Sequence, residues 1–156
     1  MTDWIVLAGF IVACFGVASS GAFFRPGEWY RSIRKPSWTP PNWLFAPAWT
    51  LLYILIAIAG WLVWRKAGFQ GAAGAFTIYI VQLLLNAGWP AVFFGLQRIK
   101  AGFAEVSLLW LSIAATIAAF APIDETAALL LVPYLCWVTF AAGLNFAILR
   151  LNPERP

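Results

Sequence analysis

The sequence predicts an all-α integral membrane protein, folded as a bundle of five transmembrane helices. Hydrophobic residues make up 63% of its 156 residues and charged residues only 10%, far from the composition of a soluble protein. Five apolar segments are each long enough to cross about 30 Å of hydrocarbon. Because backbone polar groups in lipid must find partners within their own segment, we expect all five to be helical. The whole chain, residues 1–156, is therefore predicted to form one domain.

The five predicted helices are joined by short connectors, except after the first helix. Their ranges are residues 4–24, 43–64, 72–94, 101–121 and 127–149. Five crossings put eight basic residues on the side of the first connector and the C-terminus, and two on the other side. The positive-inside rule then predicts that the side with eight is cytoplasmic. The net charge of +4 thus reflects topology, and no nucleic-acid partner is expected.

The first connector, residues 25–42, is longer than two neighbouring antiparallel helices need. It includes the prolines Pro36, Pro40 and Pro41 and the aromatic residues Trp29, Tyr30 and Trp38. Each proline lacks an amide hydrogen and fixes its own φ, so we expect an ordered, non-helical segment. Its aromatic content is not typical of disorder. We predict a Pro/Trp-rich loop that caps one end of the bundle.

An aromatic face follows in the second predicted helix. Phe45, Trp49 and Tyr53 recur at i, i+4 and i+8, which puts them on one side of a helix that begins near Asn42. Two interpretations stay open. One is that these residues anchor the helix at the membrane interface beside a proline-rich turn. The other is that they form one wall of an enclosed site.

Two further stripes bring polar groups to membrane depth. The stripe in the third helix, at i, i+4, i+7 and i+11, consists of Gln82, Asn86, Trp89 and Phe93. The stripe in the fifth helix consists of Trp137, Ala141, Leu144 and Asn145. Amides are costly against lipid, so we expect them to face the bundle interior. There they either hydrogen-bond between helices, at about 1 kcal/mol each, or line a cavity for a large, flat, apolar ligand.

Few side chains in this sequence suit metal binding or acid–base catalysis. There is no His, and the only Met is the first residue, so neither haem ligation through these residues nor a structural zinc site is expected. Glu105 is the only acid inside a predicted span. We therefore expect no acid–base pair, no base-activated nucleophile and no ion pathway at depth. A ligand-binding protein is favoured over a hydrolytic enzyme.

Four stretches of the chain carry a resemblance to a known family. They are WY at 29–30, KPSWTPPNWLFAPAWTLLY at 35–53, QLLLNAGWPAVFF at 82–94 and PYLCWVTFAAGLNFAILRLN at 133–152. With them the chain resembles the translocator protein family, also called the tryptophan-rich sensory proteins or peripheral-type benzodiazepine receptors. The resemblance covers nearly the whole chain.

The resemblance implies a five-helix bundle, commonly a homodimer, that binds porphyrins such as protoporphyrin IX and benzodiazepine-site ligands beneath the first connector. The porphyrin is then a ligand, and no resident cofactor is implied. Carried over by motif, the pocket consists of Tyr30, Pro40, Phe45, Trp49, Tyr53, Asn86, Trp89, Trp137, Ala141 and Leu144. The connector and the two stripes add Trp38, Gln82, Phe93 and Asn145 to the predicted site.

Two further features of the family concern porphyrin breakdown and cholesterol binding. In some members, the tryptophans that match Trp49 and Trp137 are implicated in light- and oxygen-dependent porphyrin breakdown. Members that bind cholesterol have a tyrosine in a Leu/Val-x-Tyr-x-Arg/Lys pattern, where this chain has Phe146. Tight sterol binding is therefore not expected. A bacterial-type member is favoured, in the bacterial cell membrane or alternatively the outer membrane.

Three functions follow from these observations. The first is a membrane receptor or carrier for porphyrins, acting in tetrapyrrole homeostasis, transport or stress sensing. The second is a porphyrin-degrading photo-oxidative enzyme. The third is a scaffold that assembles partners through small residues of the first helix, namely Gly9, Ala13, Gly16, Ser20 and Gly21. These small residues either pack inside the bundle or form a homodimer seam.

Overall fold

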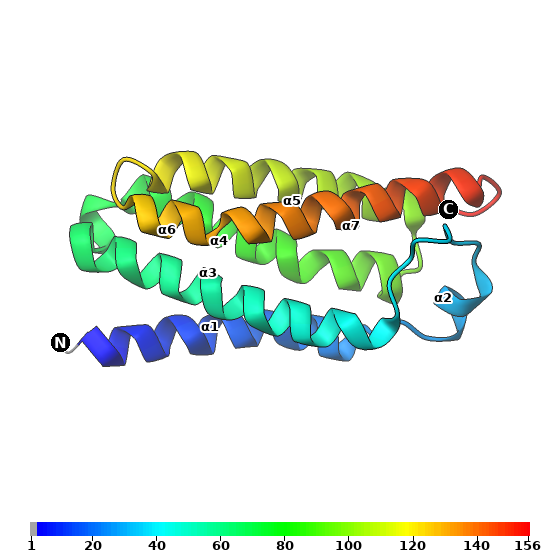
Figure 1. Cartoon of the computed structure of the whole chain (residues 1–156), viewed down its shortest axis with the longest axis horizontal. Helices are drawn as coiled ribbons and strands as arrows, with labels where there is room; N and C mark the ends of the chain where they lie inside the picture. Colours follow the sequence, from blue (N-terminus) through cyan, green and yellow to red (C-terminus); the bar gives the residue numbers. More distant parts are fainter. Residues whose placement is uncertain (1–2) are drawn as a thin grey trace.

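The computed structural model describes residues 3–156, and five of its helical segments are long and apolar enough to cross a membrane (Figure 1). They are Asp3–Phe23, Asn42–Gly71, Ala73–Gly95, Ile99–Phe120 and Glu125–Leu151. The described part of the chain contains no strand. The predicted all-α bundle of five transmembrane helices is confirmed, and the chain is a multi-pass membrane protein.

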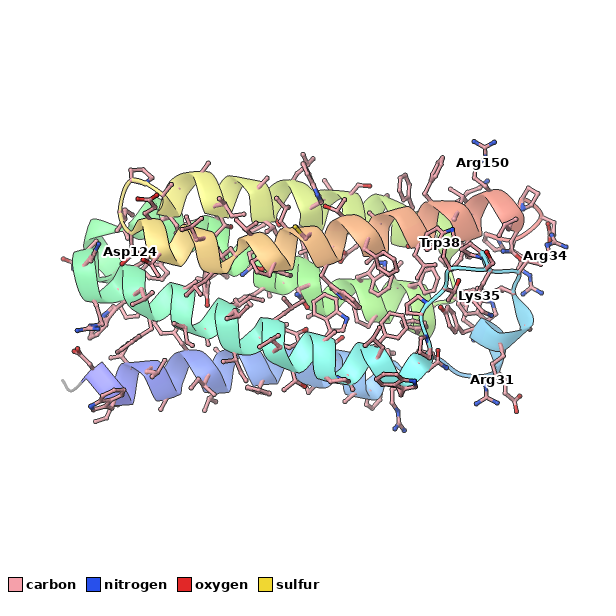
Figure 2. The ribbon with its side chains drawn as sticks, in the orientation of Figure 1. Arg31, Arg34, Lys35, Trp38, Asp124 and Arg150 are labelled. Carbon is pink, nitrogen blue, oxygen red and sulfur yellow. The ribbon has the colours of Figure 1, made fainter. Side chains whose placement is uncertain are left out.

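The helices run lengthwise beside one another, and the two ends of the bundle carry different residues. In the labels of Figure 1 they are α1 (Asp3–Phe23), α2 (Glu28–Ser32), α3 (Asn42–Gly71), α4 (Ala73–Pro90), the π-helical η1 (Ala91–Gly95), α5 (Ile99–Phe120), α6 (Glu125–Leu130) and α7 (Val132–Leu151). One end, here called the α2 end, holds α2 and the C-terminus; the other, the α6 end, holds the start of α1. Figure 2 shows at the α2 end Arg31, Arg34, Lys35 and Arg150, and at the α6 end Asp124. Which side of the membrane each end faces stays a prediction.

The second helix is longer than predicted. Residues 65–71 were expected to be a connector, but α3 runs through Arg65 and Lys66 to Gly71. Arg and Lys are good helix formers, so the helix continues beyond the apolar span that defined the predicted end. The chain kinks at Gly68, which adopts φ +70° and ψ 173°. A glycine tolerates this backbone conformation without the strain that a Cβ would bring.

Two prolines change the predicted third and fifth helices. Pro90 ends the regular part of α4, because it cannot donate an amide hydrogen bond, and the wider η1 turn follows. The fifth helix, predicted as one segment, breaks at Leu131 into α6 and α7. Pro133 lies in the first turn of α7, where its missing donor is tolerated. Asp124 caps α6, because its Oδ1 accepts from the Ala127 amide at 2.9 Å.

The first connector contains a helix that the sequence did not predict, α2, while residues 33–41 are non-helical. This segment is attached to the end of α7. The Arg34 amide donates to Asn152 Oδ1 at 3.0 Å, and Asn152 Nδ2 donates to the Arg34 carbonyl at 2.8 Å. Lys35 Nζ donates to the Tyr30 carbonyl at 2.5 Å, and burial lowers the pKa of Lys35. Hydrogen bonds from both backbone and side chains therefore hold the connector against the C-terminal end of α7.

Candidate ligand-binding cavity

A cavity of about 490 Å³ lies in the half of the bundle nearer the α2 end. Four helices contribute the buried part of its wall, which consists of Tyr53 of α3, Asn86 and Trp89 of α4, Val106 and Leu109 of α5, and Val138 and Ala141 of α7. Phe45 and Trp49, both half-buried, continue this wall along α3. The volume is in the range typical of small-molecule sites, about 300–1,000 Å³.

The cavity opens between α1 and α3. Its exposed lining residues are Phe15, Gly21 and Ala22 of α1, Arg25 after α1, and Asn42, Ala46 and Thr50 of α3. All of these lie on the two helices or directly beyond them, whereas the lining residues of α5 and α7 are buried. The predicted spans put Phe15, Ala46 and Thr50 at membrane depth, so we expect this part of the opening to lie within the bilayer.

A chain of hydrogen bonds begins at the cavity wall and continues behind it. The Tyr53 hydroxyl donates to Asn86 Oδ1 at 2.5 Å, and Asn86 Nδ2 donates to the Tyr134 hydroxyl at 2.7 Å. The Tyr134 hydroxyl in turn donates to Gln82 Oε1 at 2.7 Å. All four side chains are buried, and the chain connects α3, α4 and α7. It fixes the orientation of the Asn86 amide at the cavity.

Aromatic rings pack around Trp49 on the cavity wall. Its ring centroid lies 5.7 Å from that of Tyr53 and 6.3 Å from that of Trp137, with the two indoles nearly perpendicular at 87°. Phe45 contacts Trp137 from the same side, at 6.1 Å. Edge-to-face contacts of this kind stabilise aromatic pairs by about 0.5–1.5 kcal/mol. Trp137 therefore packs against two of the lining aromatic residues of α3, Phe45 and Trp49.

A second, much smaller cavity of about 10 Å³ lies beneath the connector. It shares Phe45 and Trp89 with the main cavity and is also lined by Tyr30, Phe93, Phe94, Leu144, Asn145 and Ile148. Trp89 Nε1 donates to Asn145 Oδ1 at 3.1 Å, and Asn145 Nδ2 donates to the Ile99 carbonyl at 3.0 Å. The Tyr30 hydroxyl is buried without a partner, and burial raises the pKa of Tyr30 to about 12.

The pattern of aromatic and amide side chains in this bundle matches a known family. A model of the TspO/MBR family matches residues 10–151. The chain belongs to the TspO/MBR family. The tryptophan-rich sensory protein of Cereibacter sphaeroides is 44% identical over 154 residues, which cover 99% of this chain and 96% of that protein. The tryptophan-rich protein TspO of Chlorobaculum tepidum is 45% identical, with 96% and 97% covered.

More distant members are similar over the same length. The translocator protein of Homo sapiens is 38% identical over 156 residues, which cover 96% of this chain and 91% of that protein. The resemblance drawn from the sequence motifs is therefore confirmed at the level of the family.

In this TspO/MBR-family chain, the predicted site residues fall into three groups. The main cavity is lined by Phe45, Trp49, Tyr53, Asn86, Trp89 and Ala141. The small cavity is lined by Tyr30, Phe93, Leu144 and Asn145, together with Phe45 and Trp89. Neither cavity is lined by Trp38, Pro40, Gln82 or Trp137. The three amides Gln82, Asn86 and Asn145 are 1%, 3% and 1% exposed, so their predicted interior position is confirmed.

The four residues outside both cavities have identifiable positions. Trp38 is 50% exposed and packs against Phe140, with ring centroids 5.6 Å apart. Gln82 belongs to the hydrogen-bonded chain, and Trp137 lies behind Trp49 with its Nε1 buried and unpartnered. Pro40 lies in the non-helical segment before α3. Gln82 thus follows the interhelical interpretation, while Asn86 and Asn145 each hydrogen-bond between helices and also line a cavity.

Sequence reasoning missed Tyr134 and the contribution of α1. Tyr134 had a signal, because Tyr134, Val138, Ala141 and Asn145 fall at i, i+4, i+7 and i+11, the same spacing as the stripe in α4. In α1 the lining residues Phe15, Ala18 and Ala22 had none, because the apolar residues of this helix do not gather on one face. Arg25 was counted only as a topology charge.

Proposed function

We propose that this chain is a membrane receptor or carrier that binds porphyrins of the protoporphyrin IX type, and benzodiazepine-site ligands, in the main cavity. The names of its relatives, a tryptophan-rich sensory protein and a translocator protein, support a sensory or translocator role in a membrane. Binding would serve tetrapyrrole homeostasis, transport or stress sensing. The observation that carries the proposal is the cavity wall, where Trp49 lies beside the Tyr53–Asn86 hydrogen bond.

The aromatic residues of this wall suit a flat, apolar ligand. Trp49 and Phe45 line the cavity and are held by Trp137 from behind. Large rigid rings bury much apolar surface at a low cost in side-chain entropy, and they favour stacked or edge-to-face contacts with another π system. Since a porphyrin macrocycle is flat, rigid and aromatic, it matches this surface better than a flexible chain does.

Asn86 supplies the polar contact that orients such a ligand. Its Oδ1 accepts from Tyr53 and its Nδ2 donates to Tyr134. An amide has two donor hydrogens and two acceptor lone pairs, so one of each is left for a ligand. The remaining donor and acceptor of this buried amide are costly to leave without partners, which favours ligands that bond to them.

The experiment is a titration of the purified protein in a nonionic detergent with protoporphyrin IX, in the dark, followed by tryptophan fluorescence. We expect saturable quenching. Trp49→Phe removes an indole from the wall and should weaken binding about fivefold, from the 0.5–1.5 kcal/mol typical of aromatic pairs. Asn86→Ala should weaken it by a similar factor.

The matched control is Trp43→Phe, because Trp43 also lies on α3 but is 71% exposed on its outer surface. It should leave the affinity unchanged, which separates site binding from partitioning of the porphyrin into the micelle. Thermal unfolding of each variant identifies any loss of folded protein. Equal affinities for wild type, Trp49→Phe and Asn86→Ala would contradict the assigned cavity.

A second candidate, photo-oxidative breakdown of the bound porphyrin, is favoured by the contact between Trp49 and Trp137. Light absorbed by a porphyrin sensitises oxygen, and an electron-rich indole beside it is a ready reaction partner. Illumination in air should then bleach the porphyrin absorbance, and exclusion of oxygen should prevent bleaching. Trp49→Phe or Trp137→Phe should abolish it while binding persists. A stable porphyrin spectrum under light and air would exclude this candidate.

A further inference from the structure

The main cavity has a single charged lining residue within the described chain, Arg25. Its other polar lining groups, among them Asn42, Thr50 and Asn86, are neutral. Arg25 lies where α1 has ended and Asn42 lies where α3 begins, so both belong to the α2 end of the opening. The cavity therefore has an apolar, aromatic interior and a cationic mouth.

The backbone around Arg25 is held in place. Just before it, the Phe24 amide donates to the Ser20 carbonyl at 2.8 Å. The Phe24 ring lies against Gly95, where a Cβ would come within 2.7 Å of the ring. Just after it, Pro26 fixes its own φ. The position of the Arg25 backbone at the mouth is thus set by packing between α1 and η1.

The Arg25 guanidinium is free to bind a ligand, in contrast to its basic neighbours. Arg34 Nη2 pairs with Glu154 Oε1 at 2.7 Å, and Lys35 Nζ donates to two carbonyls of the connector. Within residues 3–156, no carboxylate lies within ion-pair distance of Arg25, and its side chain is exposed. A guanidinium can donate two parallel N–H hydrogen bonds to the two oxygens of a carboxylate.

We propose that Arg25 pairs with a carboxylate of a bound porphyrin, so that among porphyrins the cavity prefers those with a free carboxylate at one edge. The aromatic body of such a ligand occupies the interior beside Trp49, and its carboxylate lies at the mouth. This inference rests on the proposed function and adds the ligand class: a dicarboxylic porphyrin is preferred over its neutral ester. Arg25 is then a specificity-determining residue.

An anionic lipid headgroup offers the same chemistry to this guanidinium, since we expect part of the opening to lie within the bilayer. The two sources of the anion differ in one respect. A lipid phosphate would compete with the ligand carboxylate, whereas a ligand carboxylate needs no lipid. Measurements in a nonionic detergent without phospholipid, and then in nanodiscs with and without phosphatidylglycerol, separate them.

The test compares protoporphyrin IX with its dimethyl ester, which has the same macrocycle and no charge. Arg25→Gln should weaken binding of protoporphyrin IX about tenfold, an effect between those typical of an exposed and of a desolvated ion pair. The affinity for the dimethyl ester should stay within about twofold of the wild-type value. Arg25→Lys keeps the charge without the fork and should give an intermediate loss. Because each ligand is compared between wild type and variant, differences in micelle partitioning cancel.

The matched control is Arg31→Gln, an exposed arginine at the same end that lines neither cavity. It should change neither affinity, which separates a pair with Arg25 from the general positive field of the α2 end. Equal loss for both porphyrins in Arg25→Gln, or no loss for either, would overturn the inference while the proposed function stands. Failure of wild type to bind either porphyrin would overturn both. Loss of the Arg25 dependence on addition of phosphatidylglycerol would assign the guanidinium to lipid and overturn the inference.

Discussion

The same two helices, α1 and α3, are bonded directly to each other near the α6 end, whereas toward the α2 end both line the cavity. At the α6 end, Asp3 Oδ2 pairs with Arg65 Nε at 3.1 Å, and Trp61 Nε1 donates to the Asp3 carbonyl at 2.9 Å. The rings of Trp4 and Trp61 stack at 5.9 Å. Toward the other end, these helices supply the exposed rim of the cavity. The same helix pair is thus fixed together at one end and forms the cavity opening toward the other.

Glycines have opposite roles in the two halves. Gly60 of α3 lets Phe10 and Tyr79 approach its backbone, and a Cβ there would lie 2.7 Å from the Phe10 ring and 2.8 Å from the Tyr79 hydroxyl. Gly21 of α1 lines the cavity, and nothing lies within 4 Å of its Cβ position. Small residues in a membrane helix therefore either bring helices together or leave room, depending on what the partner helix presents.

The largest expected effect is on stability, from filling the tight contact. Gly60→Leu would force the Phe10 and Tyr79 side chains apart inside a packed aromatic cluster, at a cost of about 3 kcal/mol. The control is Gly143→Leu, because Gly143 is exposed in mid-helix with nothing within 4 Å. Thermal or denaturant unfolding in detergent measures both. A Gly60→Leu protein as stable as Gly143→Leu would contradict close packing at the α6 end.

The next effect is on binding, from filling the cavity. Gly21→Leu adds a side chain to the rim and should weaken porphyrin binding tenfold or more, about 1.4 kcal/mol. The same change should leave the unfolding midpoint unchanged or raise it, because Leu favours a helix by up to about 1 kcal/mol over Gly. The two variants should therefore differ: Gly60→Leu lowers stability, whereas Gly21→Leu lowers affinity and keeps stability. A Gly21→Leu protein that binds as wild type would mean that the ligand enters elsewhere.

The part of the cavity wall on α3 and α4 could be predicted from the sequence, because it depends on helical periodicity. Phe45, Trp49 and Tyr53 line one cavity because residues four apart share a helix face. Asn86 is buried because an amide is costly in contact with lipid. Both inferences need only local geometry and the solvent properties of a bilayer.

The rest depends on contacts between segments that are distant in sequence. The apolar residues of α1 do not gather on one face, so periodicity could not indicate which of its residues line the cavity. Phe45 and Trp89 divide the predicted site into a large and a small cavity, which depends on how side chains of two helices pack. The kink at Gly68 was missed because the predicted helix ended where its apolar run ended and not where its backbone does.

A smaller effect is expected from the hydrogen-bonded chain behind the cavity. Tyr134→Phe would leave Gln82 Oε1 and Asn86 Nδ2 without their partner, at a cost of about 1 kcal/mol to the free energy of unfolding. Tyr30→Phe is the matched control, because its hydroxyl is equally buried but has no partner to lose. It should be neutral or slightly stabilising. Equal losses in the two variants would mean that the chain of bonds contributes nothing beyond packing.

The smallest effect is a pH dependence at the α2 end. Burial raises the pKa of Tyr30 to about 12, while an exposed tyrosine titrates near 10. Between these values the folded protein keeps a proton that the unfolded chain loses, so stability is complete below pH 10 and falls as the pH rises toward 12. At pH 10.5 the loss should be under about 1 kcal/mol. Tyr30→Phe lacks this proton, so its unfolding midpoint should fall less than that of wild type between pH 9 and 10.5, and parallel curves would show that Tyr30 ionises as freely as a tyrosine in water.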